Sequence, residues 1–142
     1  MMEDAVGPGE PVTYSARLHW ILFASPLALF GAGLVAILFH PLSAIALLAA
    51  AAFAILGIYV KFVTTEIVIT DRRVVYRTGL IARRTMEMNK EKIESIDVSQ
   101  SILGRILDFG TVAVKGTGGG IEAISSVAAP FALRNHVAAM SA

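Results

Sequence analysis

The sequence is most informative in what it lacks, because it has no cysteine and residues 20–60 contain no Asp, Glu, Lys or Arg. The absence of cysteine excludes a disulfide framework, a thiolate metal site and a cysteine nucleophile. Charged residues make up only 16% of the chain, whereas soluble domains contain about a quarter. A hydrophobic content of 56% excludes a disordered chain. The net charge of +1 is too small to indicate nucleic acid as a partner.

The charge-free block contains two apolar segments, residues 20–39 and 42–60, that are long enough to cross a membrane. At about 1.5 Å per residue, each helix would span roughly the 30 Å of a bilayer's hydrocarbon core. His40 and Pro41 separate them, and proline disfavours helix in the residue before it. The pattern therefore predicts two antiparallel transmembrane helices joined by a tight turn. The predicted boundaries are a cytoplasmic N-terminal segment at 1–19, the hairpin at 20–62 and a cytoplasmic domain at 63–142.

A cleaved signal peptide does not explain the first apolar segment. Its run exceeds the usual length of about 7–15 residues, and Glu3, Asp4 and Glu10 precede it in place of a basic cluster. Arg17 lies before the first helix and Lys61 after the second, while the turn between the helices has no Lys or Arg. The positive-inside rule therefore predicts a multi-pass protein of the cell inner membrane with both termini in the cytoplasm.

Amphipathic residues at the cytoplasmic ends of these helices are expected to anchor them at the membrane interface. The predicted anchors are Arg17, His19, Trp20, Tyr59, Lys61 and Phe62. His19 is either a titrating site or, as we favour, an interfacial hydrogen-bonding residue.

Alanine recurs at every fourth position in both apolar segments. The candidates for helix packing are Ala24, Ala28, Ala32 and Ala36 in the first segment and Ala46, Ala50 and Ala54 in the second. Small residues at this spacing let helix backbones approach closely. Either the two stripes face each other within the hairpin, which we favour, or one of them binds another membrane protein. The membrane segments carry no charge, so a proton relay or ion path is not expected.

The remaining residues alternate between apolar and polar in short runs that are typical of strands. Strands are expected at 65–70, 73–78, 81–88, 93–99, 111–115 and 121–127, with helices at 101–108 and from Pro130 onward. Ser101 is expected to cap the first of these helices, with Gly110 near its end. Residues 116–120 are rich in glycine but lack the lysine and hydroxyl of a P-loop, so we interpret them as a hairpin turn. The order predicts a small, mostly-β barrel or sandwich with a C-terminal helix.

The stretches TDRRVVYRTGLIARRT (residues 70–85) and KIESIDVSQSILGRILDFGTVAVKGTGG (residues 92–119) resemble the bacterial pleckstrin-homology (PH)-like membrane proteins. Gly9, Glu10, Tyr14 and the run from 17 to 20 are similar to that family too, as is the two-helix hairpin. The resemblance implies a PH-type barrel or sandwich of seven strands, one more than the six expected above. It implies no known enzymatic activity.

No catalytic or metal-binding pattern is evident. His19, His40 and His136 lack metal-ligand spacing, and no G-x-S-x-G motif is present. Two carboxylate pairs, Asp97 with Asp108 and Glu87 with Glu91, are most simply solvated side chains. We therefore expect no catalytic residue, metal or cofactor, and a chain that is not an enzyme.

Arginines form the most suggestive polar group, because guanidinium binds phosphate in a bidentate manner and favours anionic lipid surfaces. The candidates for contact with lipid or another anion are Arg72, Arg73, Arg77, Arg83 and Arg84. The interpretation that we favour is that they only solvate strand faces and protect sheet edges. We expect a non-catalytic, membrane-anchored module whose partners are membrane lipids and a protein, either itself or a larger complex that it serves as an accessory or assembly subunit. The alternative function is a sensor of anionic lipid headgroups at the cytoplasmic leaflet.

Overall fold

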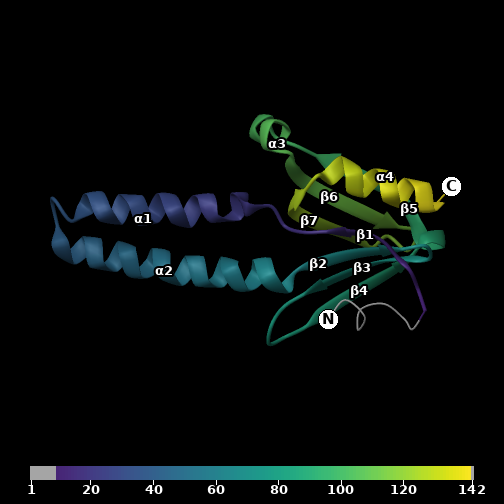
Figure 1. Ribbon diagram of the computed structural model, residues 1–142, viewed down its shortest axis with the longest axis horizontal. Helices are drawn as coiled ribbons and strands as arrows, with labels where there is room; N and C mark the ends of the chain where they lie inside the picture. Colours follow the sequence, from purple (N-terminus) through teal and green to yellow (C-terminus); the bar gives the residue numbers. More distant parts are fainter. Residues whose placement is uncertain (1–8, 142) are drawn as a thin grey trace. The chain divides into compact units, whose positions relative to one another are not determined.

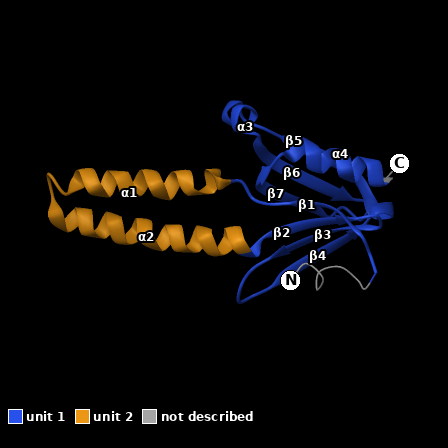
Figure 2. Ribbon diagram, viewed as in Figure 1, with its two compact units in different colours: residues 1–19, 64–142 blue, residues 20–63 orange. Residues whose placement is uncertain are grey.

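A computed structural model describes residues 9–141, so residues 1–8 of the predicted N-terminal segment, including Glu3 and Asp4, lie outside the described residues. The chain divides into two compact units (Figure 2). Of the described residues, 9–19 and 64–141 form the β-sheet unit, and residues 20–63 form the helical unit.

The described residues of the β-sheet unit form two antiparallel sheets (Figure 1). The first sheet has the order β1-β2-β3-β4 and the second β5-β6-β7. Their bounds are β1 Val12–Ala16, β2 Glu66–Thr70, β3 Arg73–Thr78, β4 Arg84–Asn89, β5 Ile93–Ser99, β6 Phe109–Gly116 and β7 Ile121–Ala128. The described strands thus number seven, and the count of six expected from the sequence was wrong because it omitted β1.

β1 and the residues after it connect the two sheets. β1 pairs with β2, placing Ala16 opposite Ile67. The chain then continues along β7, where Leu18 lies opposite Val127 and the His19 N–H donates to the Ser126 carbonyl at 2.7 Å. Residues 12–19 are therefore an integral part of the β-sheet unit, although the whole helical unit separates them in sequence from β2.

The core of this unit is built from β-branched and other aliphatic side chains. Every residue from Ile67 to Thr70 is buried, so β2 is covered on both faces and not on one face as its alternation suggested. α4 (Pro130–Ser141) begins at the predicted proline and buries Leu133 and Val137. Its His136 ring stacks on Tyr14 of β1, with ring centroids 4.2 Å apart. The C-terminal helix thus packs against the strand that the sequence analysis missed.

Two short helical segments connect the strands. η3 (Lys90–Lys92) links the two sheets, and α3 (Ile102–Leu107) links β5 to β6. The predicted cap of α3 is confirmed, because the Gly104 N–H donates to the Ser101 hydroxyl at 3.0 Å. α3 ends at Leu107, and its C-terminal cap is Asp108, which has a left-handed φ of 57°, and not the glycine at 110 that was expected near the end.

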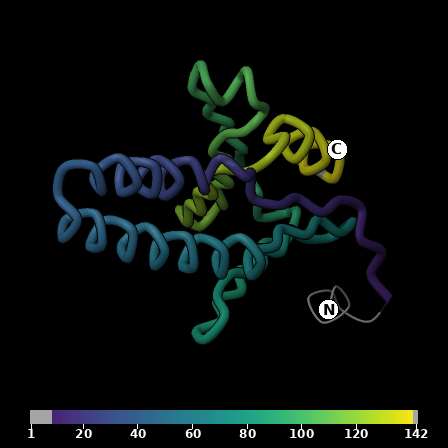
Figure 3. Tube along the Cα trace, turned by 60° about the vertical axis from the view of Figure 1, so that its left-hand side comes forward, coloured from purple at the N-terminus to yellow at the C-terminus, as the bar shows by residue number. Residues whose placement is uncertain are grey.

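The helical unit contains η2 (Trp20–Phe23), α1 (Ala24–Ala36) and α2 (Pro41–Thr64). α1 and α2 run antiparallel and side by side (Figures 1 and 3). Among the described residues, α2 is the one helix with the length and composition needed to cross a membrane, and the apolar helical stretch Trp20–Ala36 is shorter. The prediction of two membrane-spanning helices therefore remains a prediction.

The contact between α1 and α2 uses small residues, but not the alanine stripes. A Cβ built on Gly33 would lie 2.8 Å from the Leu48 side chain and 3.3 Å from its backbone nitrogen, so a larger residue at this crossing would force Leu48 to shift. The buried residues are Pro26 and Gly33 in α1 and Ala44 and Ala51 in α2. Both pairs are seven residues apart, which is the spacing of a left-handed helix pair. The spacing of four that guided the sequence analysis did not identify this seam.

Candidate functional site

The five candidate arginines do not form a single cluster. Arg72 lies in the turn before β3, and β3 runs from Arg73 to Thr78, where it pairs with Arg84. Four residues of strand, at about 3.3 Å each, separate Arg73 from Arg77 by roughly 13 Å. Arg72 and Arg73 therefore lie at one end of the first sheet, and Arg77, Arg83 and Arg84 lie toward the other.

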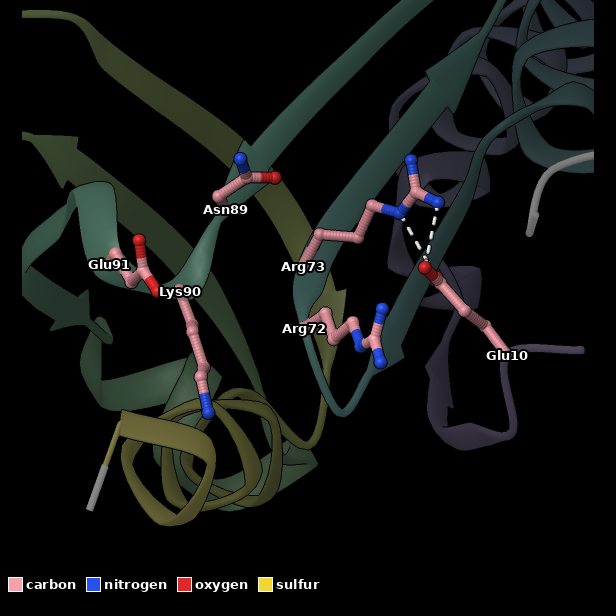
Figure 4. A pocket seen from close by; sticks show the side chains of 6 residues that line it. All are labelled: Glu10, Arg72, Arg73, Asn89, Lys90 and Glu91. Carbon is pink, nitrogen blue, oxygen red and sulfur yellow. Dashed lines mark hydrogen bonds and ion pairs between the residues drawn. The ribbon is translucent and has the colours of Figure 1, made fainter.

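Arg73 is held by two carboxylates. Its Nη2 and Nε donate to the two oxygens of Glu10 at 2.8 and 3.0 Å, and its Nη1 donates to Glu87 Oε2 at 2.7 Å (Figure 4 shows the Glu10 pair). The hydrogen bond from Arg73 is the main cause that lowers the pKa of Glu10. The same carboxylates raise the pKa of Arg73, Glu10 foremost. This bidentate pair fastens the chain just before β1 to the first sheet.

An open pocket of about 420 Å³ lies beside this ion pair. It is lined by Glu10, Arg72, Arg73, Asn89, Lys90 and Glu91 (Figure 4). The lining mixes cations with two carboxylates, and Glu10 already occupies the guanidinium of Arg73. An anion entering here would meet Glu10 and Glu91, so the pocket is a poor phosphate site.

The other arginines lie near the junction end, which we define as the end of the β-sheet unit that carries His19 and Thr64, where the chain passes into the helical unit. Glu66 pairs with Arg77 in the first sheet, and Thr78 with Arg84. Arg83 and Arg84 are exposed, and the nearest carboxylate oxygen to Arg84 belongs to Glu122, 4.0 Å away. These two arginines are far more accessible than Arg73.

Two exposed aliphatic residues at this end, Leu80 and Ile81, were not among the site residues predicted from the sequence. The loop between β3 and β4 exposes Leu80 by 61% and Ile81 by 98%. Ile81 was expected to begin a strand, but β4 begins at Arg84. Gly79 has φ +99°, and a Cβ there would lie 2.1 Å from the Ala82 carbonyl oxygen, so a glycine-dependent turn replaces the expected start of the strand. The sequence signal that could have predicted this loop is the pair Leu80 and Ile81, which follows a glycine and precedes two arginines.

The predicted interface anchors divide between the two units. Trp20 and Tyr59 are exposed, and the Phe62 ring contacts Phe23 edge-on at 5.6 Å. This contact brings the start of the helical unit beside its last turns, where Lys61 is exposed. Arg17 and His19 belong to the β-sheet unit instead. His19 is 9% exposed and stacks on Phe109, so the structure gives it a packing role.

The alanine stripes remain largely on the surface of the helical unit. The exposed members are Ala24, Ala28, Ala32, Ala46 and Ala50, and the half-buried members are Ala36 and Ala54. The favoured interpretation, in which the stripes face each other inside the hairpin, was therefore wrong. The alternative, in which a stripe binds another membrane protein, remains a prediction.

Two of the carboxylates considered as possible acid pairs form ion pairs with basic side chains instead. Asp97 pairs with Lys115 at 2.6 Å, and Glu87 pairs with Arg73. Within residues 9–141, no group of three His, Asp or Glu residues is placed to hold a metal ion.

Comparison with known proteins identifies one relationship. A family model described as Bacterial PH domain matches residues 22–141, a region that includes both α2 and the strands from β2 to β7. The match confirms the resemblance drawn from residues 70–85 and 92–119. No curated protein and no solved structure matches the chain. The mostly-β sandwich with a C-terminal helix fits this family.

Proposed function

We propose, because this chain belongs to the bacterial PH domain family, that it is a non-catalytic, membrane-anchored module that binds a protein partner. PH-like domains are modules for interaction with proteins or lipids. The helical unit would hold the β-sheet unit at the cytoplasmic face of the inner membrane, with both termini in the cytoplasm. The partner would be a second copy of the chain or a larger membrane complex, which this protein would serve as an accessory or assembly subunit.

The observation that carries this proposal is the exposure of alanines in both helices. The hairpin closes on Gly33, Ala44 and Ala51, so its own packing does not use Ala28 or Ala50. Helices associate in lipid through small residues that allow close backbone contact. A third helix could therefore pack on either face without disturbing the pair already formed.

Support for the membrane anchor comes from α2 and from the order of residues along the hairpin. α2 has the length and hydropathy of a spanning helix. Trp20, Tyr59 and Lys61 lie toward one end of the antiparallel pair, which is the arrangement expected of an interfacial belt with basic flanks. His40 and Pro41 lie at the other end, where no Lys or Arg is present.

Replacing exposed alanines of α1 with larger residues would test the proposal that the helical unit binds a protein partner. In an Ala28→Leu/Ala32→Leu variant, the added side chains would block close helix contact. We expect complexes crosslinked in native membranes to be lost, as measured by native gels and mass spectrometry after mild-detergent extraction. A Leu27→Phe/Leu34→Phe variant is the matched control, since it enlarges exposed large side chains of the same helix and should leave the complexes intact.

Two results would contradict this proposal. One is a wild-type chain that runs as a partner-free monomer in mild detergent and in native membranes. The other is a set of complexes that both variants leave unchanged, because the alanine faces would then have no part in association.

The exposure of Arg83 and Arg84 supports a second function, recognition of anionic headgroups at the cytoplasmic leaflet. Hydrogen exchange of residues 79–85 in the full chain, in nanodiscs with and without phosphatidylglycerol, would test it. We expect the anionic lipid to slow exchange in the wild type but not in Arg83→Gln/Arg84→Gln. Exchange that ignores lipid charge in the wild type would exclude this function.

A further inference from the structure

The junction end of the β-sheet unit carries a second protruding segment besides the β3–β4 loop. α3 exposes Ile102 by 82%, Leu103 by 55% and Ile106 by 74%. A short helix normally turns its largest aliphatic side chains toward the core, but α3 turns Gly104 inward instead. A Cβ on Gly104 would lie 2.5 Å from the Phe109 carbonyl oxygen, so the helix sits on its glycine and its aliphatic side chains face outward.

Pairing within the sheets places both segments at the junction end. In the first sheet, Thr78 lies opposite Arg84, so the β3–β4 loop extends beyond the edge where Glu66 begins β2. In the second sheet, α3 follows Ser99 and precedes Phe109, and Phe109 lies opposite Ala128. The neighbouring bridge from Leu18 to Val127 leads directly to His19. Figures 1 and 2 show α3 and the β3–β4 loop projecting from the same end of this unit.

α3 is fastened to the sheet and does not hang freely from it. Its N-terminus is capped by Ser101, and the side-chain amide of Gln100 donates to the carbonyls of Gly104 and Phe109 at 3.3 and 3.1 Å. The orientation of its aliphatic side chains is therefore fixed by the fold. Exposed apolar side chains that are held outward in this way mark a surface for a protein or a membrane.

The flanking charges favour a lipid surface. Arg83 and Arg84 follow the loop, and Arg105 lies within α3 between its exposed aliphatic residues. The exposed acidic residue beside α3 is Asp108, which forms its C-terminal cap. Aliphatic residues next to arginines suit the bilayer interface, where apolar side chains enter about 5–10 Å and guanidinium groups reach the phosphates.

We infer that Leu80 and Ile81 of the β3–β4 loop, together with Ile102, Leu103 and Ile106 of α3, insert into the lipid interface of the membrane that the helical unit spans. The inference rests on the proposed membrane anchor. It adds to headgroup recognition because the aliphatic side chains, and not the arginines alone, make the contact. Docking at two separate points would fix the tilt of the β-sheet unit against the bilayer.

The absence of cysteine allows a direct test on the full chain. Single substitutions Ile81→Cys and Ile106→Cys would be labelled with an environment-sensitive fluorophore, in nanodiscs that hold one copy each and contain phosphatidylcholine and phosphatidylglycerol. Thr117→Cys, in the exposed turn between β6 and β7, is the aqueous control. Ala50→Cys, on the exposed face of α2, reports the anchor. We expect labels at 81 and 106 to shift to shorter wavelength, to be quenched by brominated lipid and to lose quenching by iodide.

The result at position 50 separates the inference from the proposed function. If the label at 50 is in lipid while those at 81 and 106 resemble 117, the inference is overturned and the anchor stands. If the label at 50 is also aqueous, the anchor and the inference both fail. If the labels at 81 and 106 leave water only after a membrane extract is added, the surface binds a protein, which also overturns the inference.

Discussion

Glu10 and Arg73 show how two single residues fasten the start of the chain to a sheet built much later in the sequence. Because Arg73 lowers the pKa of Glu10, the folded state favours the carboxylate relative to the unfolded chain. The resulting stabilisation is fully present above the ordinary pKa of 4.5. It is lost as the pH falls through the lowered value, so the ion pair stabilises the protein at neutral pH but not in strong acid.

We therefore expect Glu10→Gln to lower the melting temperature of the detergent-solubilised chain at pH 7, with the difference from wild type shrinking as the pH is lowered below 4.5. Thermal unfolding followed by circular dichroism at pH 7 and at a series of lower pH values would measure this. Glu91→Gln is the matched control, because Glu91 lines the same pocket but forms no ion pair among the described residues. A loss that stays the same at every pH tested would show that the shape of the Glu10 side chain, and not its charge, stabilises the protein.

Residue patterns in the sequence identified some side-chain roles and missed others. Ser101 was recognised as a cap because its hydroxyl serves a backbone N–H three residues away. The partners of Arg73 were not predicted, because Glu10 lies 63 residues away and only the fold brings the two together. The five candidate arginines were grouped because they are close in sequence, but β3 is extended, so Arg73 and Arg77 lie well apart along it.

At the scale of elements, the packing of α1 on α2 depends on Gly33. We expect Gly33→Leu to destabilise the hairpin by about 1–3 kcal/mol, the usual cost of forcing extra methylene groups into a packed contact. The measurement is the free energy of unfolding in a titration of mild detergent with SDS. Gly31→Leu is the control on the same helix, because a Cβ at Gly31 meets nothing within 4 Å. Equal effects of both variants would show that the loss reflects helix propensity and not the crossing.

Strands and helices were predicted well where the alternation of apolar and polar residues extended over several positions, or where residues typical of turns or helix starts marked the boundary. β3 and β5 have the expected bounds, and α4 begins at Pro130. β1 was missed because five residues between a polar segment and an apolar block give too few positions to show alternation. α3 was recognised as a helix, but its outward-facing aliphatic residues were not, because spacing alone does not say which side of a helix meets the core.

At the scale of the whole molecule, the β-sheet unit is discontinuous in sequence. Residues 64–142 alone would leave β2 without β1, exposing the edge that Ala16 and its neighbours cover, and unpaired apolar edges aggregate. A fusion of residues 9–19 to 64–142 through a flexible Gly/Ser linker restores that strand and should be soluble and unfold cooperatively.

The comparison is made on the two purified polypeptides, by light scattering and by thermal unfolding followed by circular dichroism. As a control, a fusion carrying Leu18→Asp keeps the length of the linked chain but places a charge at a buried position opposite Val127. It should behave like 64–142. If residues 64–142 were monomeric and as stable as the fusion, β1 would not be needed for this unit to fold.

The interruption between β1 and β2 also imposes an order on biosynthesis. When β1 leaves the ribosome, its main partner strand has not been made, and the next residues to emerge are the apolar helices. The first sheet can close only after both helices have been synthesised, because β2 follows them in the chain and pairs with β1. Folding of the β-sheet unit therefore has to wait for the helical unit to be made, although the two units are separate in the structure.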